Sequence, residues 1–190
     1  MKLISLLEKL EYTCLQGSTD QEVKNVIYDS RKVEEGSLFI CIRGAVVDGH
    51  KFVPDVVAKG AKVLIVEEAV EAPEDVTVIL VKDTRYAMAF ISAAYFGYPA
   101  EKLKTIGITG TKGKTTTTYM VKSILENAGY KVGLIGTIEA IIGDKVIPAK
   151  NTTPESYVIQ EYFHEMAEAG CDCVVMEVSS QGLMLHRTQG

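Results

Sequence analysis

A short run of glycine, lysine and threonine near the middle of the chain carries the strongest chemical signal. An apolar stretch at residues 105–108 leads into a glycine-rich loop, and a helical pattern begins directly after Gly-Lys-Thr. This order is typical of a phosphate-binding loop, because glycines let the main chain approach phosphates and a helix N-terminus attracts anions. We therefore predict that ATP is bound by Gly110, Thr111, Lys112, Gly113, Lys114, Thr115 and Thr116.

Two side chains of this loop have specific expected tasks. The Lys114 ammonium can reach the β- and γ-phosphates, which makes it the predicted catalytic residue, and the Thr115 hydroxyl can ligate Mg²⁺. The common pattern G-x-x-x-x-G-K-[ST] has a glycine where this chain has Ile108, and the glycine available here is Gly110. The alternative is an ordinary glycine turn before a helix. The strand pattern before the loop and the helical pattern after it favour the phosphate loop.

A single acid interrupts an otherwise apolar strand pattern at residues 172–178. Glu177 lies near the end of this strand and is followed by Ser179. A buried acid is costly unless it is paired or ligates a metal, and Mg²⁺ prefers oxygen ligands. Ligands of open α/β sheets gather at the carboxyl ends of the strands. We therefore predict that Glu177 binds Mg²⁺, and the alternative is a salt-bridged glutamate.

The composition of the 190-residue chain excludes several classes of protein. A net charge of −5 gives no basic footprint for nucleic acid. No apolar run approaches the roughly 18 residues of a membrane span, and apolar residues at positions 3, 6, 7 and 10 predict an amphipathic first helix. The four cysteines contain no C-x-x-C pair, which favours a reduced, cytoplasmic protein. They are Cys14, Cys41, Cys171 and Cys173.

Strand and helix patterns alternate along the chain, which predicts an α/β fold. The sequence 97–100, Gly-Tyr-Pro-Ala, divides a small first domain, 1–98, from the first part of an open-sheet, P-loop ATPase-type domain, 99–190. Strands are expected at 22–28, 37–42, 62–66, 77–81, 131–137 and 172–178. Helices are expected at 52–59, at 84–96 with Asp83 as cap, and after the loop, where Tyr119, Met120, Ile124 and Leu125 share a face. A hairpin is expected in 138–148, with Gly143-Asp144 at its turn.

The segment 151–155, Asn-Thr-Thr-Pro-Glu, has a local structural explanation that covers only part of it. Thr153 is the predicted N-cap of a helix at 154–169, with Pro154 in its first position. This does not explain Asn151 and Thr152. The apolar face expected in the core carries Val158, Tyr162, Phe163 and Met166.

Several of these segments together resemble one family. Asp-Ser-Arg at 29–31, the short glycine loop at 110–116, Asn-Thr-Thr-Pro-Glu at 151–155 and Met-Glu-Val-Ser-Ser-x-Gly-Leu-x-x-His-Arg at 176–187 are similar to segments of the Mur ligases of the MurE type. The resemblance covers essentially all 190 residues. It implies a UDP-binding first domain and an ATP-binding second domain.

The resemblance also implies a reaction and a set of binding residues. ATP would phosphorylate the terminal carboxylate of UDP-MurNAc-L-Ala-D-Glu, and the amine of a diamino acid, L-lysine or meso-diaminopimelate, would attack the acyl phosphate. Ser30 would contact the UDP group, with residues 45–47 beside it. Glu177 would bind Mg²⁺. The muramoyl-dipeptide would be bound by Asn151, Thr152, Thr153, Ser179 and Arg187. Ala-Val-Val at 45–47 and Leu185 are apolar where the family suggests polar contacts.

Members of this family have a longer central domain and a further domain that selects the amino acid. We therefore expect the chain to be an amino-terminal fragment that does not catalyse ligation unaided. We also expect its first domain to be the more stable and the strand at 172–178 to be partly uncovered. Two alternatives remain open: another Mur-type ligase, such as a MurF or a cyanophycin-synthetase-like enzyme, and a non-catalytic nucleotide-binding module.

Overall fold

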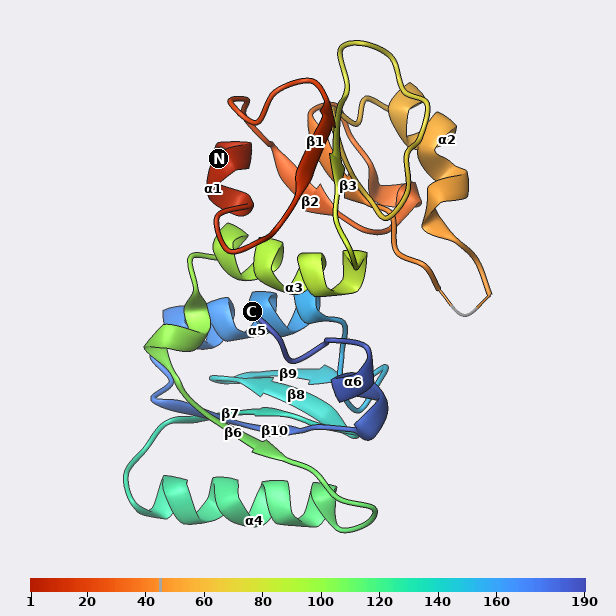
Figure 1. The fold of residues 1–190 in the computed structure, drawn as a ribbon. Helices are drawn as coiled ribbons and strands as arrows, with labels where there is room; N and C mark the ends of the chain where they lie inside the picture. Colours follow the sequence, from red (N-terminus) through yellow and green to blue (C-terminus); the bar gives the residue numbers. More distant parts are fainter. Residues whose placement is uncertain (45) are drawn as a thin grey trace. The chain divides into compact units, whose positions relative to one another are not determined.

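The computed structural model describes residues 1–44 and 46–190. The chain forms two compact units, Met1–Tyr95 and Phe96–Gly190. Each unit contains a five-stranded sheet with helices packed on it, so the predicted α/β class is confirmed (Figure 1). Among the described residues, no helix is long and apolar enough to cross a lipid bilayer.

The first unit is built on a sheet in the order β1-β5-β4-β3-β2. Strands β2 to β5 are parallel, and β1 runs antiparallel to β5 at one edge. Its elements are α1 (Leu3–Leu6), β1 (Thr13–Gln16), β2 (Asn25–Ile27), the 3₁₀ turn η1 (Ser30–Lys32), β3 (Ser37–Ile40), the 3₁₀ turn η2 (Gly49–Phe52), α2 (Val53–Ala58), β4 (Val63–Val66), β5 (Thr77–Leu80) and α3 (Thr84–Tyr95).

The central strands of this sheet are buried along their whole length, which shows that both faces of the sheet are covered. Phe39 and Leu64 pack with Val53 and Val56 of α2 on one face. Alternate strand residues point to the other face, which carries α3. The Asp83 carboxylate accepts a hydrogen bond of 2.8 Å from the Tyr86 N–H, so the predicted cap of α3 is confirmed.

The second unit has a sheet in the order β6-β10-β7-β8-β9. Strands β6, β10 and β7 are parallel, and β8 and β9 form an antiparallel hairpin beside β7. Its elements are the 3₁₀ turn η3 (Pro99–Lys102), β6 (Lys104–Ile108), α4 (Lys114–Asn127), β7 (Val132–Ile135), β8 (Glu139–Ile142), β9 (Lys145–Pro148), α5 (Ser156–Glu168), β10 (Cys173–Glu177) and α6 (Ser180–Met184).

Alternation along β10 separates the two faces of this sheet. Cys173 and Val175 pack toward α4, in a cluster with Val121 and Leu125. Val174 and Met176 lie in the larger cluster that contains Phe163 and Met166 of α5. Figure 1 shows α4 and α5 on opposite sides of the sheet. Glu177 follows Val175 by two residues, so its side chain belongs to the α4 face.

The hairpin was predicted correctly, and its turn has the expected geometry. Gly143 has a φ of 57°, whereas Asp144 is not among the described residues with positive φ. A positive φ at the first turn position only is characteristic of a type II′ turn, which needs glycine at that position.

The expected amphipathic first helix is present, with Leu3 and Leu6 buried, although it is one turn long. Strand β1 was not predicted, because its side chains are mostly exposed and show no apolar alternation. Three other expectations about elements were wrong. Met120 and Ile124 of α4 are 60% and 68% exposed, because the helix instead packs through Val121 and Leu125. On α5, Phe163 and Met166 are buried as expected, but Ile159 is buried in place of Val158. Strand β10 is not uncovered, since it lies between β6 and β7 and all five of its residues are buried.

All four cysteines are free thiols, and three of them are buried. Cys41, Cys171 and Cys173 are buried, whereas Cys14 is exposed. Burial, with the charges of Asp48 and Glu67, raises the pKa of Cys41 to about 12. Burial is also the main reason why the pKa of Cys173 is raised.

Candidate functional site

The glycine-rich loop joins the end of β6 to the first turn of α4. Gly113 is the N-cap of α4 and has a φ of 78°, a left-handed conformation that favours glycine. Gly110 has a φ of 150°, and a Cβ on Gly113 would meet no atom within 4 Å. The constraint at Gly113 is therefore conformational. The loop leads directly into the N-terminus of a 14-residue helix, which is the arrangement expected for phosphate binding.

The Lys114 side chain folds back across this loop. Its ammonium donates a hydrogen bond of 2.8 Å to the Gly110 carbonyl oxygen. The Thr118 hydroxyl, fully buried in the next turn, donates to the Lys114 carbonyl at 2.8 Å. The Lys114 ammonium thus lies over the loop, and the Thr118 hydrogen bond stabilises the helical turn that carries it.

The Glu177 carboxylate is 1% exposed and accepts hydrogen bonds from two different elements. The Thr115 hydroxyl of α4 donates to Oε2 at 2.9 Å. Thr137, which follows β7, donates to Oε1 through its N–H at 2.9 Å and to Oε2 through its hydroxyl at 3.1 Å. Among the described residues, no lysine, arginine or histidine pairs with this acid, so its burial is compensated by hydroxyl and main-chain donors rather than by a salt bridge.

The spacing of Thr115 and Glu177 fits a magnesium site. Adjacent ligands of an octahedral Mg²⁺ at about 2.0–2.1 Å are separated by about 2.9 Å. The Thr115 Oγ1 to Glu177 Oε2 distance is 2.9 Å. The two oxygens can therefore become neighbouring ligands of the ion without a change in their separation.

Close packing keeps this acid in place from the β7 side. A Cβ on Gly136 would lie 2.6 Å from Glu177 Oε1, so only glycine leaves room for the carboxylate. Tyr119, one turn beyond Thr115, donates to Glu139 Oε1 at 2.8 Å. Burial, this hydrogen bond and the charges of Glu139 and Glu177 raise the pKa of Tyr119 to about 12, so the phenol keeps its proton at neutral pH.

Thr153 does not cap α5, and this prediction was wrong. The helix begins at Ser156, with Glu155 as its N-cap residue. The Thr153 hydroxyl donates instead to the Glu177 carbonyl at 2.9 Å and accepts from the Ser179 N–H at 3.0 Å. Pro154 disfavours a helical conformation at the preceding residue, which leaves the buried Thr153 hydroxyl for the end of β10.

The segment after β10 folds against Thr153. The Ser179 hydroxyl accepts from the Gly182 N–H at 3.0 Å and caps α6. A Cβ on Gly182 would lie 2.8 Å from Thr153, so glycine permits this close approach. Arg187 donates to the Thr153 carbonyl at 2.9 Å and pairs with Glu155 at 2.7 Å.

The structure therefore brings together most of the predicted site residues of the second unit. Thr115, Glu177, Thr152, Thr153 and Ser179 are linked directly or through Thr137 at the carboxyl end of β10. Arg187 joins them through Thr153, and Asn151 is exposed at the start of the same segment. Sequence reasoning assigned no role to Thr137, although a Gly-Thr pair at the end of a strand next to β10 was an available signal.

Ser30 lies in the first unit and begins the turn η1. Its carbonyl accepts a hydrogen bond of 3.0 Å from Lys59, and its hydroxyl makes no hydrogen bond to another described residue. Arg31 hydrogen-bonds the Asp29 carboxylate and lowers the pKa of Asp29 to about 2. Ala45, one of the three residues expected beside Ser30, lies outside the described residues, and Val46 is 94% exposed.

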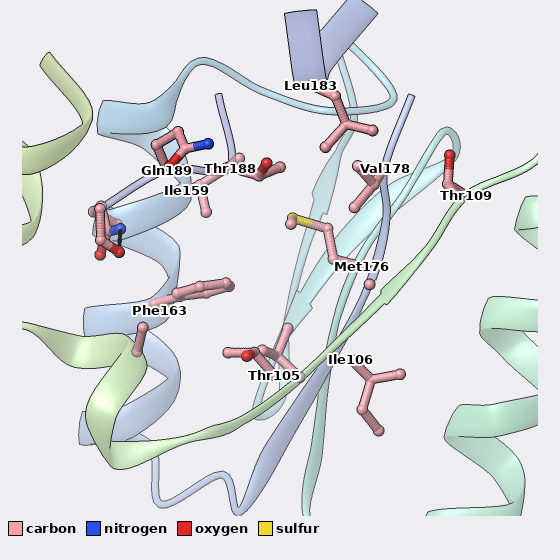
Figure 2. Close-up of a pocket in the computed structure, with 15 residues that line it drawn as sticks. Thr105, Ile106, Thr109, Ile159, Phe163, Met176, Val178, Leu183, Thr188 and Gln189 are labelled. Carbon is pink, nitrogen blue, oxygen red and sulfur yellow. Dashed lines mark hydrogen bonds between the residues drawn. The ribbon is translucent and has the colours of Figure 1, made fainter. Parts of the chain in front are cut away.

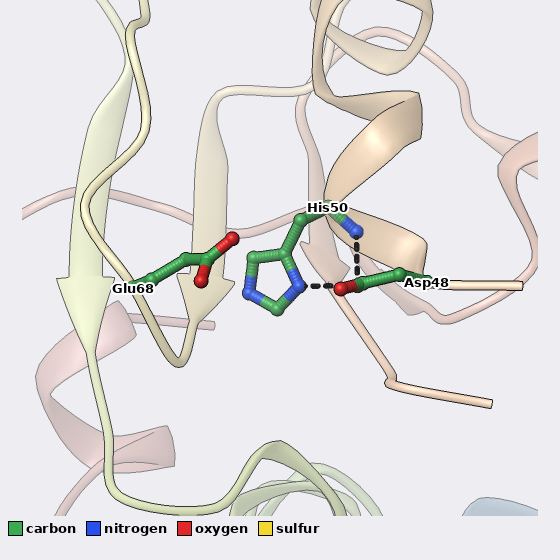
Figure 3. Close-up of side chains that lie close together, drawn as sticks. All are labelled: Asp48, His50 and Glu68. Carbon is green, nitrogen blue, oxygen red and sulfur yellow. Dashed lines mark hydrogen bonds and ion pairs between the residues drawn. The ribbon is translucent and has the colours of Figure 1, made fainter. Parts of the chain in front are cut away.

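A group of potential metal ligands occurs in the first unit, at Asp48, His50 and Glu68 (Figure 3). The His50 Nδ1 lies 2.6 Å from Asp48 Oδ1, and Nε2 accepts from the Glu67 N–H at 3.0 Å. This pattern fixes the neutral tautomer that carries its proton on Nδ1. Both ring nitrogens are used, so His50 ties the loop before α2 to the end of β4 and offers no lone pair to a metal.

A cavity of about 410 Å³ lies on the other face of the second sheet, between β6, β10 and α5. Figure 2 shows Phe163 of α5 and Met176 of β10 pointing toward each other across it, with Thr109 at one side. Its lining includes Gln160, which is 3% exposed. Because Glu177 points to the α4 face, this cavity is separate from the loop and acid described above.

A sheet with parallel strands β6, β10 and β7, and a Gly-Lys-Thr loop between its first strand and the following helix, defines a P-loop α/β protein. Two family models match the sequence: "Mur ligase family, catalytic domain" over residues 22–96 and "Mur ligase middle domain" over residues 108–190. The chain belongs to the Mur ligase family.

Individual relatives agree with this assignment. The chain is 53% identical over 190 residues to a UDP-N-acetylmuramoyl-L-alanyl-D-glutamate–2,6-diaminopimelate ligase of Clostridium perfringens. A solved MurF of Acinetobacter baumannii is 27% identical, with a TM-score of 0.65 over 94% of this chain and 36% of that one. A solved UDP-N-acetylmuramoyl-L-alanyl-D-glutamate–2,6-diaminopimelate ligase has a TM-score of 0.80 over 100% of this chain and 38% of that one. Its identity is 23%, so it supports the fold.

The chain is shorter than these relatives. It is matched over 100% of its own length but spans 39% of the clostridial protein.

Proposed function

We propose that this chain is the part of an ATP-dependent ligase that binds ATP and the UDP-linked substrate. The ligase would join 2,6-diaminopimelate to UDP-MurNAc-L-Ala-D-Glu in peptidoglycan synthesis. The observation that carries the proposal is the position of Glu177, whose carboxylate contacts Thr115 of the phosphate loop on one side and Thr137, next to Thr152, on the other. The choice of diamino acid is supported by relatives at 44–53% identity, which are 2,6-diaminopimelate ligases.

The residues of the second unit have distinct tasks in this proposal. Residues 110–116 bind ATP, and the Lys114 ammonium neutralises charge on the β- and γ-phosphates. Thr115 and Glu177 would hold Mg²⁺, which supplies further charge neutralisation at the transferred phosphoryl group when it is bound. The muramoyl-dipeptide is bound by Asn151, Thr152, Thr153, Ser179 and Arg187.

The first unit holds the UDP group in this proposal, and residues 1–98 and 99–190 are two domains with separate binding tasks. A cytoplasmic location goes with the proposal. It is supported by the four free cysteines.

The test is a ligation assay with the full-length gene product. We expect ADP release that requires UDP-MurNAc-L-Ala-D-Glu and Mg²⁺, with tripeptide formed from meso-diaminopimelate rather than L-lysine. We expect no tripeptide from residues 1–190 assayed under the same conditions. Ligation of a dipeptide to a tripeptide substrate would instead indicate a MurF-type enzyme, and nucleotide binding without substrate-dependent ADP release would indicate a non-catalytic module.

The role of Ser30 has its own test. Replacing Ser30 with Ala should weaken binding of the UDP-linked substrate about 10-fold, because one hydrogen bond to a charged or polar ligand group is lost. Affinity for ATP should not change. Isothermal titration of the full-length enzyme with each ligand measures both effects, and Ser5→Ala, an exposed serine of α1, is the control. Equal loss of ATP affinity, or unchanged substrate affinity, would contradict the assignment.

A further inference from the structure

Thr137 lies between the predicted cation site at Glu177 and the predicted substrate site at Thr152, which are far apart in the sequence. Its hydroxyl lies 3.1 Å from Glu177 Oε2 and 3.1 Å from Thr152 Oγ1. Its N–H also donates to Glu177 Oε1 at 2.9 Å. One residue therefore touches both the acid expected to hold the cation and a threonine expected to hold the substrate.

The direction of these hydrogen bonds follows from the number of protons available. An ionised carboxylate only accepts, so the Thr137 hydroxyl donates its single proton to Glu177 Oε2. Thr137 can then act only as an acceptor toward Thr152, whose own proton must point at Thr137. The Thr152 hydroxyl is thereby directed into the protein and presents lone pairs, not a proton, to a ligand.

A cation at Glu177 would change this arrangement. Glu177 Oε2 already accepts from two hydroxyls, those of Thr115 and Thr137. An ion bound to this oxygen would offset the negative charge of the carboxylate and make it a weaker hydrogen-bond acceptor for the Thr137 hydroxyl. The Thr137 hydroxyl is then free to donate to Thr152, and Thr152 is free to donate its own proton outward to a substrate oxygen.

We propose that Thr137 is a positioning residue that couples occupation of the cation site at Glu177 to binding of the UDP-linked substrate at Thr152. This inference rests on the proposed function and deepens it. It differs from a purely structural role, in which Thr137 only holds Glu177 in place, because a structural role predicts no dependence of substrate affinity on the cation.

The experiment measures the dissociation constant of UDP-MurNAc-L-Ala-D-Glu by titration calorimetry in the full-length enzyme saturated with ADP. Each titration is done with Mg²⁺ and with EDTA. We expect Mg²⁺ to tighten binding about 5-fold or more, which is the lower end of typical coupling between sites. Thr137→Val keeps the size and the main-chain N–H but removes the hydroxyl, and we expect it to reduce this ratio to about one. Thr137→Ser should restore it.

A double-mutant cycle tests the path of the coupling. Thr152→Val should weaken substrate binding and also abolish the Mg²⁺ dependence, and adding Thr137→Val should not reduce the ratio further. The inference is overturned if Thr137→Val keeps the wild-type ratio, or if the wild-type ratio is one. Failure of the wild-type enzyme to bind the UDP-linked substrate at all would overturn the proposed function itself.

Discussion

Replacing Lys114 with Ala should reduce the turnover of the full-length enzyme by orders of magnitude and weaken its affinity for ATP. The ammonium lies over the phosphate loop, 2.8 Å from the Gly110 carbonyl. When ATP is bound, this charge is expected to face the β- and γ-phosphates, where removal of a positioned charge costs roughly 10²- to 10³-fold in rate. The hydrogen bond from Lys114 to the Gly110 carbonyl is exposed to solvent, so stability should change by less than about 0.5 kcal/mol.

ADP release and titration with ATP measure these effects, and thermal unfolding measures stability. Lys122→Ala is the matched control, because it removes the same charge from the same helix, where Lys122 pairs with Glu126. Its kinetics should stay close to those of the wild type. Normal turnover in Lys114→Ala would show that residues 110–116 are a glycine turn and not a phosphate site.

Replacing Glu177 with Gln should reduce turnover by about 10²-fold or more and remove its normal dependence on Mg²⁺. An amide keeps the shape of the side chain but has no negative charge, and it cannot accept at both atoms from the three donors that surround the carboxylate. Charge stabilisation by a bound metal is worth several kcal/mol, and each 1.4 kcal/mol is a factor of ten in rate.

The measurement is the Mg²⁺ concentration that gives half-maximal ADP release, together with Mg²⁺-dependent binding of ADP. Glu177→Asp, which keeps the charge but shortens the side chain, should retain a Mg²⁺ requirement at a higher half-maximal concentration. Glu165→Gln, a half-buried acid of α5 paired with Lys145, is the control. A wild-type Mg²⁺ profile in Glu177→Gln would refute the assignment of this acid as a metal ligand.

Features with a local cause were predictable from the sequence. The glycine-rich loop before α4 depends on consecutive residues, and Gly113 adopts a left-handed conformation at the N-cap of the helix. The hairpin turn at Gly143 and the cap at Asp83 have equally local causes. Each of these features is decided within a few residues, where backbone conformational preferences and capping hydrogen bonds dominate.

Features that depend on strand order were not predictable in this way. Strand β10 lies between β6 and β7, although it comes last in the sequence. This insertion buries β10 and also places Glu177 between Thr115 and Thr137. Thr153 shows the same limit, because a good local cap sequence is overridden by two hydrogen bonds to residues about 25 positions away. A hydrogen-bond partner that is distant in the sequence does not affect the pattern of neighbouring residues, so it cannot be predicted from that pattern.

Each unit contains a buried free cysteine whose alkylation rate can report local unfolding of that unit. Alkylating reagents attack the thiolate, and burial with a raised pKa suppresses it at Cys41 in the first unit and at Cys173 in the second. Cys41 and Cys173 are therefore alkylated only when the surrounding structure unfolds locally. The alkylation rate of exposed Cys14 gives the reference rate for a thiol that the fold does not protect. The labelling rates at Cys41 and Cys173, compared in one sample, rank the opening free energies of the two units with no engineered probe.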